Sequence, residues 1–184
     1  MNRTIHRLAM IAAIVAFCVI VLGAWVRLSH AGLGCPDWPG CYGQLTWPDA
    51  AQEIESANQA FPERPFESSK AWREMVHRYL AGILMILVFV ISWKCWRGPQ
   101  FNHQFRALAT ALLILIIFQA LLGMWTVTLK LKPFIVMAHL LGGLTSFSLI
   151  LWLMFSSRRL YADKPSVKVR RMRGPIVVAI AVLA

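Results

Sequence analysis

The stretch AWREMVHRYLAGILMILVFVISWKCW, residues 71–96, carries Glu74, His77 and Arg78 at the start of a long apolar segment. An apolar run of this kind is typical of a helix that crosses a lipid bilayer, which needs about 20 residues. Ionisable side chains are rare in such helices because hydrocarbon does not solvate them, and they usually mark a functional site. The stretch therefore predicts a transmembrane helix with a polar site near its first end.

The whole chain has the composition of an integral membrane protein. Of its 184 residues, 58% are hydrophobic and 15% are charged, and the mean hydropathy is +0.59. Hydropathy predicts four spanning helices, at residues 8–26, 72–93, 107–127 and 134–155. Because polar segments join them in turn, we expect an all-α, up-and-down four-helix transmembrane bundle.

The predicted bundle occupies residues 1–160 and includes a long outer loop at residues 29–70. A basic cytoplasmic linker follows at residues 161–174. The apolar residues 175–184 are too few to cross a bilayer. We interpret them as the start of a truncated fifth transmembrane helix, and we expect the sequence to be a fragment of a longer protein.

The net charge of +11 is distributed unevenly along the chain. Most Lys and Arg residues fall at residues 1–7, 94–106 and 156–174, which share one side of the membrane in this topology. The positive-inside rule places that side in the cytoplasm. We expect a multi-pass protein of the inner (cytoplasmic) membrane with a cytoplasmic N-terminus, whose basic segments contact anionic lipid rather than nucleic acid.

Two histidines are predicted to lie at the same depth in the bundle. His77 and His139 each follow shortly after the outer end of a helix that runs inward. Imidazoles on two helices of a bundle can ligate one metal from opposite sides, and haem suits apolar walls. Gly142 and Gly143 would let a flat macrocycle approach. The alternative is that each histidine hydrogen-bonds to a neighbouring helix. We predict a haem between the two, towards the outer face.

Three charged residues accompany this predicted haem site. Glu74 lies three residues before His77 and so on the same helix face. It could exchange protons beside the group that His77 binds, or it could stabilise the helix N-terminus. Arg27 and Arg78 could bind haem propionates or extend to lipid headgroups.

The outer loop contains Cys35 and Cys41, separated by a segment rich in Pro and Gly. The loop faces the oxidising side, where disulfides persist, and its turns could bring the two Cα atoms within bridging range. We predict a disulfide here rather than a zinc site, which would lack further ligands. Cys18 and Cys95 are interpreted as packing residues.

Four motifs together resemble one known family. GAWVRLSHAGLGCPDWPGCYGQLTWP, REMVHRYLAG, QALLGMWTVTLKLKP and AHLLGG are similar, in order and spacing, to the N-terminal half of the haem A synthase family. The resemblance covers nearly all of residues 20–145. It implies half of a tandem eight-helix protein, in which each four-helix bundle has a histidine pair on the outer side.

The resemblance implies an oxidoreductase that converts a methyl group of haem O to the formyl group of haem A, for assembly of cytochrome oxidase. His77 and His139 would face haem O, Glu74 would be catalytic, and the Cys35–Cys41 pair would assist. A haem b would lie in the missing C-terminal half. Expected partners are haem O, the lipid bilayer, haem O synthase and an electron acceptor, with a homo-oligomer as a further expectation. His30 stands where the family has a small or polar residue.

Two other functions fit the histidine pair. A bis-His membrane cytochrome b would relay electrons and would need neither Glu74 nor the cysteine loop. A non-catalytic subunit could instead deliver haem or assist assembly.

Overall fold

The computed structural model of the protein describes residues 2–162. The helices are α1 (Asn2–Leu28), α2 (Ala51–Ala60), α3 (Ser68–Arg97), α4 (His103–Thr128) and α5 (Pro133–Ala162). The predicted linker beyond residue 162 and the predicted fifth span lie outside the described residues.

Four of these helices, α1, α3, α4 and α5, are long and apolar enough to cross a membrane. This confirms the predicted all-α fold of a multi-pass membrane protein. Each helix is longer than its predicted apolar run, because helix formation continues into polar flanking residues. Ser68 and Lys70 lengthen α3 at its start, and Lys94 and Arg97 lengthen it at its end. Such residues suit the headgroup layers on either side of the hydrocarbon.

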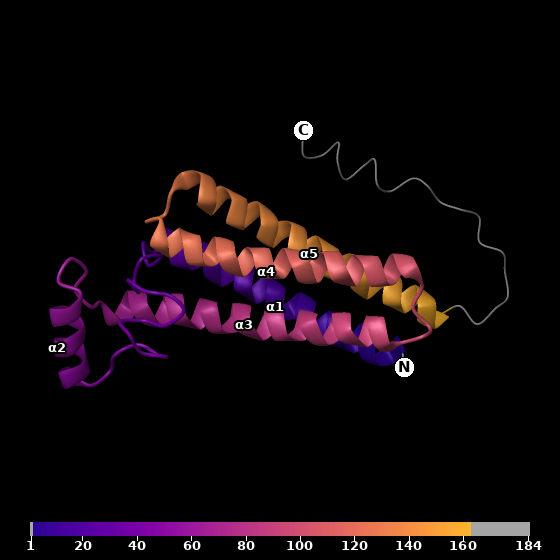
Figure 1. Ribbon diagram of the computed structural model, residues 1–184, viewed down its shortest axis with the longest axis horizontal. Coiled ribbons are helices and arrows are strands. Elements are labelled where there is room, and N and C mark those ends of the chain that lie inside the picture. The colour runs from indigo at the N-terminus through magenta and orange to yellow at the C-terminus, as the bar shows by residue number, and fades with distance from the viewer. Residues whose placement is uncertain (1, 163–184) are drawn as a thin grey trace.

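The four long helices run side by side and alternate in direction (Figure 1). Helix α1 packs against α3 and α5, and α4 packs against the same two helices. The pairs α1–α4 and α3–α5 are therefore the diagonals of the bundle. Since α3 and α5 run in the same direction, the helices that carry His77 and His139 face each other across the bundle from corresponding ends.

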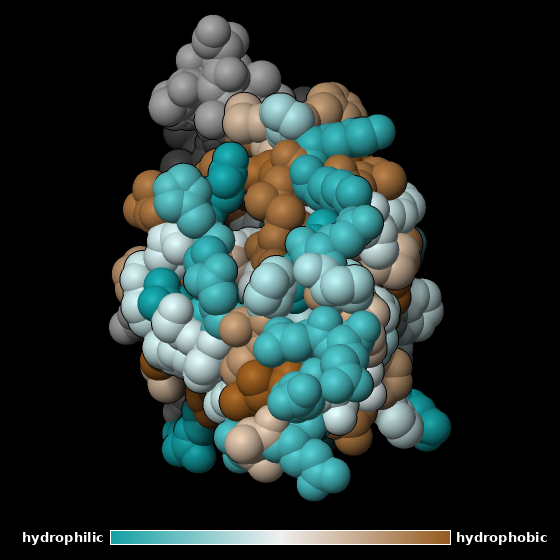
Figure 2. Space-filling model, turned by 90° about the vertical axis from the view of Figure 1, so that its left-hand side faces the viewer, coloured by the Kyte–Doolittle hydropathy of each residue, from teal (hydrophilic) through white to brown (hydrophobic). Residues whose placement is uncertain are grey.

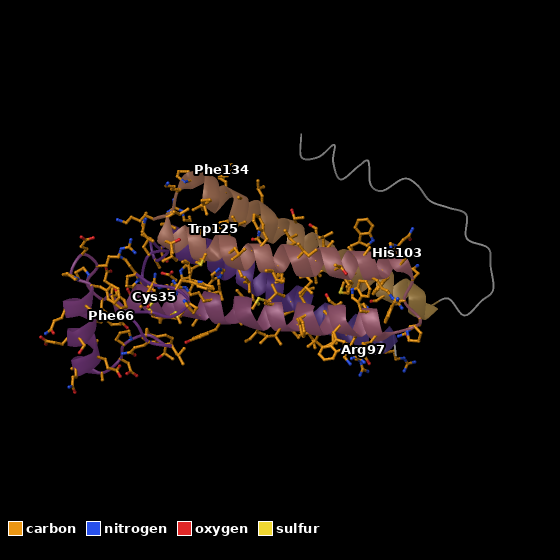
Figure 3. The ribbon with its side chains drawn as sticks, in the orientation of Figure 1. Cys35, Phe66, Arg97, His103, Trp125 and Phe134 are labelled. Atoms are coloured by element: carbon orange, nitrogen blue, oxygen red, sulfur yellow. A yellow bond between two sulfur atoms is a disulfide. The ribbon has the colours of Figure 1, made fainter. Side chains whose placement is uncertain are left out.

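The two ends of the bundle differ. The loop end carries residues 29–67, with α2, and the turn at residues 129–132; the terminal end carries Asn2 and the turn at residues 98–102 (Figures 1 and 3). At the terminal end the Asn102 side chain accepts a hydrogen bond of 2.9 Å from the Phe105 N–H and caps α4. At the loop end Pro133 begins α5, as the sequence predicts, because its fixed φ suits a first helical turn.

An aliphatic core fills the half of the bundle nearer the terminal end. From α1 it receives small residues, and from the other helices mostly larger aliphatic ones. Small side chains let membrane helices approach closely, so that dispersion contacts replace the hydrophobic effect that lipid cannot supply. The buried members are Ile5, Ala9, Ala12, Ala13, Ala16, Leu84, Val88, Ile91, Cys95, Phe101, Phe105, Ala109, Leu112, Ile116, Ile150 and Leu153.

Large apolar side chains also cover the outside of the helices. Examples are Ile14, Phe17 and Val21 on α1, Ile86 and Phe89 on α3, and Ile114 and Ile117 on α4. A soluble protein rarely exposes so continuous an apolar surface. These side chains are suited to contact with lipid.

The outer loop is more ordered than the sequence predicts. It contains the helix α2. The Glu53 carboxylate in the first turn of α2 accepts the N–H groups of Asp49 at 3.2 Å and Ala50 at 3.5 Å. These two hydrogen bonds lower the pKa of Glu53. The loop end is covered mainly by hydrophilic side chains, with hydrophobic ones visible between them (Figure 2).

A second small core lies between this loop and the start of α3. It consists of Cys35, Cys41, Tyr42, Ala57, Ala71 and Met75. The Tyr42 hydroxyl donates to the Arg64 carbonyl at 3.1 Å, and burial raises the pKa of the Tyr42 phenol. The loop is thus a folded cap that packs against the start of α3.

The α1 interface generates a packing prediction. Replacing Ala12, which is fully buried, with Leu should lower the free energy of unfolding by about 1 to 3 kcal/mol, because the larger side chain enters a filled interface. The measurement is the thermal unfolding midpoint in detergent. Ala24→Leu, at an exposed position of the same helix, is the matched control and should change it little; equal losses in the two variants would contradict the packing model.

Candidate functional site

His77 and His139 lie inside the bundle, near its loop end. Both residues are half-buried. The Nδ1 atom of each ring is fully buried and makes no hydrogen bond. The two rings interact electrostatically, which places them in one region between the diagonal helices α3 and α5. Each ring therefore retains binding capacity that the described part of the chain does not use.

Each histidine packs on a glycine of the neighbouring helix. A Cβ added at Gly23 of α1 would lie 2.9 Å from His77 Cε1, and one added at Gly123 of α4 would lie 3.5 Å from His139 Cε1. Each ring also interacts with the backbone four residues earlier on that helix, at Val19 and Gln119. In both helix pairs, α1–α3 and α4–α5, a glycine of one helix thus makes room for the histidine ring of the other.

This histidine layer lies directly beyond the aliphatic core. The buried core ends at Ala16 on α1, Leu84 on α3 and Ile116 on α4. Farther towards the loop end, Gly23 and Gly123 leave room for the imidazoles of His77 and His139. Gly82, five residues after His77, has open space where a Cβ would be. Gly142, expected to admit a macrocycle, instead faces the Gln119 amide.

Glu74 and Arg78 form a buried ion pair at the start of α3. Arg78 Nη2 donates to Glu74 Oε1 at 2.6 Å, and the two side chains are 12% and 5% exposed. The other Glu74 oxygen accepts the Cys35 N–H at 3.0 Å. Glu74 therefore does more than stabilise the helix N-terminus, which was the alternative role considered from the sequence, because the loop covers it and donates a hydrogen bond to it.

Arg78 holds the cysteine loop from its other side. Its Nη1 donates to the carbonyls of Asp37 at 3.0 Å, Pro39 at 3.2 Å and Gly40. All three carbonyls lie within the ring that the disulfide closes. Glu74 and Arg78 together form what we call the loop clamp, which binds the disulfide ring to α3.

Cys35 and Cys41 form the predicted disulfide, with Cα atoms 4.8 Å apart. Both residues are fully buried, and Cys35 lies at the loop end (Figure 3). The Asp37 carboxylate accepts the N–H groups of Tyr42 and Gly43 at 2.6 and 2.8 Å and so joins the ring to the residues that follow it. Cys95 is buried, as predicted, whereas Cys18 is exposed on α1, so its interpretation as a packing residue was wrong.

The other residues noted in the sequence lie apart from the histidines. Arg27 is exposed in the last turn of α1, and His30 is exposed just beyond it with a positive φ of 52°.

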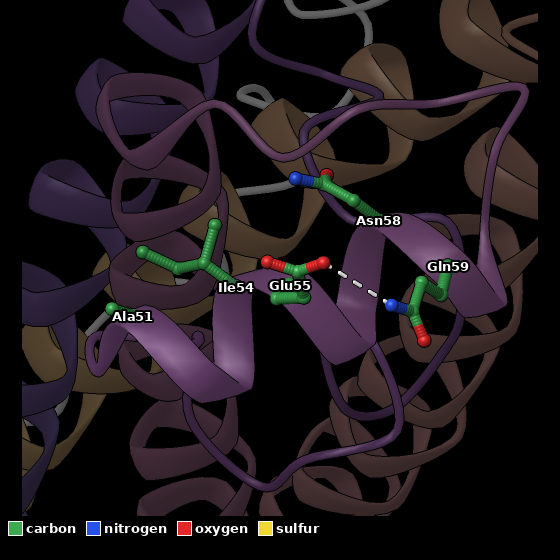
Figure 4. A pocket seen from close by; sticks show the side chains of 5 residues that line it. All are labelled: Ala51, Ile54, Glu55, Asn58 and Gln59. Atoms are coloured by element: carbon green, nitrogen blue, oxygen red, sulfur yellow. Dashed lines mark hydrogen bonds between the residues drawn. The ribbon is translucent and has the colours of Figure 1, made fainter.

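A shallow hollow runs along α2, lined by Ala51, Ile54, Glu55, Asn58 and Gln59; a hydrogen bond of 3.2 Å from Gln59 to Glu55 crosses it (Figure 4). It belongs to the outer surface of the loop.

Sequence reasoning missed Gly23, Gly123 and Gln119. All three belong to transmembrane segments, where small and amide residues have many uses. The weak signal that was present is one glycine at a similar distance from the loop end of each helix, Gly23 on α1 and Gly123 on α4.

The donor set fits haem better than a metal ion bound by protein alone. Among the described residues, no group of three or more His, Cys, Asp or Glu side chains could hold a metal ion. Structural and catalytic zinc sites need at least three such ligands. Haem iron already has its porphyrin nitrogens and needs only axial ligands, which two imidazoles can supply.

Sequence comparison now places the chain among known proteins. A family model described as cytochrome oxidase assembly protein matches residues 6–184. The chain belongs to this family. It is 47% identical over 160 residues to a haem A synthase of Shewanella oneidensis, with 86% of this chain and 48% of the relative covered. A haem A synthase of Shouchella clausii is 30% identical over 154 residues, with 83% and 46% covered. The chain spans about half the length of these curated relatives.

The loop clamp generates a stability prediction. Glu74→Gln should reduce the free energy of opening the loop by about 2 to 4 kcal/mol, because it leaves the Arg78 charge buried without its partner. Hydrogen exchange of the amides at residues 35–44 measures this. Glu67→Gln is the matched control, since it breaks an exposed ion pair with Lys70 that should contribute less than about 1 kcal/mol. Unchanged exchange in Glu74→Gln would contradict the clamp.

Proposed function

We propose that this chain forms the haem O site of a haem A synthase, in which a methyl group of the porphyrin is oxidised to a formyl group. The observation that carries the proposal is the pair of imidazoles on the diagonal helices α3 and α5, each with a buried nitrogen that lacks a partner. Membership of the cytochrome oxidase assembly family and the similarity to haem A synthases support it.

The arrangement suits haem O in three ways. His77 and His139 would bind the iron from opposite sides, and the aliphatic core below them would exclude water from the hydrocarbon edge of the ring. Lipid-facing grooves between helices could hold the farnesyl tail. The anionic propionates would be directed to the loop end, because they are poorly solvated deeper in the bilayer. Arg27 is exposed there, whereas Arg78, the other arginine expected to bind them, is held by Glu74 and by carbonyls of the cysteine loop.

The distribution of charge supports an orientation. Every described Asp and Glu belongs to the loop end, together with seven Lys and Arg residues, whereas the described charges at the terminal end are all basic and include Arg3, Arg7, Lys94, Arg97 and Arg106. By the positive-inside rule, the N-terminus would be cytoplasmic. The disulfide and the haem site would then lie towards the outer face of the inner membrane, where a disulfide persists.

Glu74 would have two roles in this proposal. It positions the cysteine loop through Cys35 and Arg78. Methyl oxidation releases protons and electrons and adds an oxygen atom, so a carboxylate three residues from His77 could also accept a proton. It can do so only when Arg78 releases it, because Arg78 stabilises the ionised form.

The test of the site is haem A formation after expression of the full-length gene in cells that make haem O and lack their own haem A synthase. His77→Ala and His139→Ala should each abolish haem A and leave haem O, as measured by extraction and chromatography of the haems. His103→Ala, at an exposed position at the terminal end, is the control and should leave haem A unchanged. Bound haem without any haem A in the unmodified protein would favour an electron-relay cytochrome instead.

The two roles of Glu74 can be separated by a double variant. Glu74→Gln alone should lower haem A, whichever role dominates. Glu74→Gln combined with Arg78→Met removes both charges and so relieves the unpaired cation. If the carboxylate takes part in proton transfer, the double variant should stay below Arg78→Met alone. Recovery to the Arg78→Met level would show that Glu74 only positions the loop.

A further inference from the structure

Gln119 presents a buried amide without a partner in the middle of the bundle. The residue is 7% exposed, and its Nε2 atom is fully buried and makes no hydrogen bond. A membrane interior offers no water to satisfy such a donor, so leaving it unpaired is costly. A donor retained in this place points to an acceptor that the chain itself does not supply.

The Gly142 carbonyl of the facing helix does not supply this acceptor. A Cβ added at Gly142 of α5 would overlap the Gln119 amide, so the amide lies directly against the α5 backbone. The Gly142 carbonyl already accepts the Ser146 hydroxyl at 2.8 Å. It also accepts the helical N–H four residues on, so both of its lone pairs are used.

The amide also lies next to the predicted haem ligand. The backbone of Gln119 interacts with the His139 ring, and Gly123, one turn nearer the loop end, packs on the same ring. On α5, Gly142 is three residues farther from the loop end than His139, a rise of about 4.5 Å. The Gln119 amide is therefore beside the histidine and on the side of the membrane middle.

We propose that the Gln119 amide donates a hydrogen bond to the hydroxyl of the hydroxyethylfarnesyl group of haem O, and so selects haem O over haem B. This inference rests on the proposed function. With the propionates at the loop end, the opposite, hydrocarbon edge of the ring reaches the depth of Gln119. The hydroxyl is the polar group that haem O has on that edge and haem B lacks. A site that provides a buried donor discriminates against a ligand without the matching acceptor.

The test is a comparison of two affinities in purified, detergent-solubilised protein. Haem O and haem B are titrated separately, and binding is followed by the absorption spectrum of the bis-imidazole haem. Gln119→Met, which keeps the side-chain volume, should weaken haem O binding about 3- to 10-fold, as expected for one hydrogen bond. Haem B binding should be unchanged, which also shows that the variant is folded. Gln104→Met, at an exposed position of the same helix, should affect neither haem.

A second variant, in α5, displaces the same amide. Gly142→Ala places a methyl group where the Gln119 amide lies, so it should also reduce the preference for haem O while Gln119 is retained. The assignment of Gln119 would be overturned by equal loss of both haems in both variants, or by unchanged haem O binding in Gln119→Met. Either result leaves the proposed haem site intact, provided that the unmodified protein binds haem. If the unmodified protein binds neither haem, the proposed function itself fails.

Discussion

A polar group buried in hydrocarbon must find its partner within the protein, and this constraint organises the loop-end half of the bundle. The chain meets it at Glu74 and Arg78, whose charges are paired and which also hydrogen-bond to the cysteine loop. Between the helices it leaves nitrogen atoms of His77, His139 and Gln119 without a partner; the Nε atoms of Arg73 and Arg106, nearer the two ends of the bundle, also lack one. The three unpartnered groups that lie together between the helices are the ones available to a ligand.

The bundle is correspondingly divided along its axis. Near the terminal end, alanines of α1 allow the helices to pack closely around an aliphatic core. Near the loop end, glycines replace side chains at the helix contacts, and imidazoles fill the notches. The packed half fixes the relative positions of the helices, and that rigidity is what allows two residues on diagonal helices to be placed for one ligand.

The loop clamp connects this interior to the folded cap. Arg78 binds three carbonyls of the disulfide ring, and Glu74 binds the N–H of its first cysteine. Both residues belong to the helix that carries His77. A change in the loop, such as reduction of the disulfide, would therefore be transmitted to the helix turn next to the histidine through charge-assisted hydrogen bonds, which are stronger than neutral ones.

The sequence by itself determined the four spans and the alternation of direction, which depend on hydropathy. It predicted the disulfide from the turn-rich segment between Cys35 and Cys41, and it singled out His77 and His139 because ionisable groups are costly in lipid. All of these are properties of the local sequence. Only the tertiary structure decided that α3 and α5 are diagonal, that Arg78 turns to the loop, and that Gln119 faces Gly142 beside His139. These depend on which helix faces meet. A transmembrane helix is apolar on nearly every side, so the hydropathy pattern does not indicate the face that turns inward.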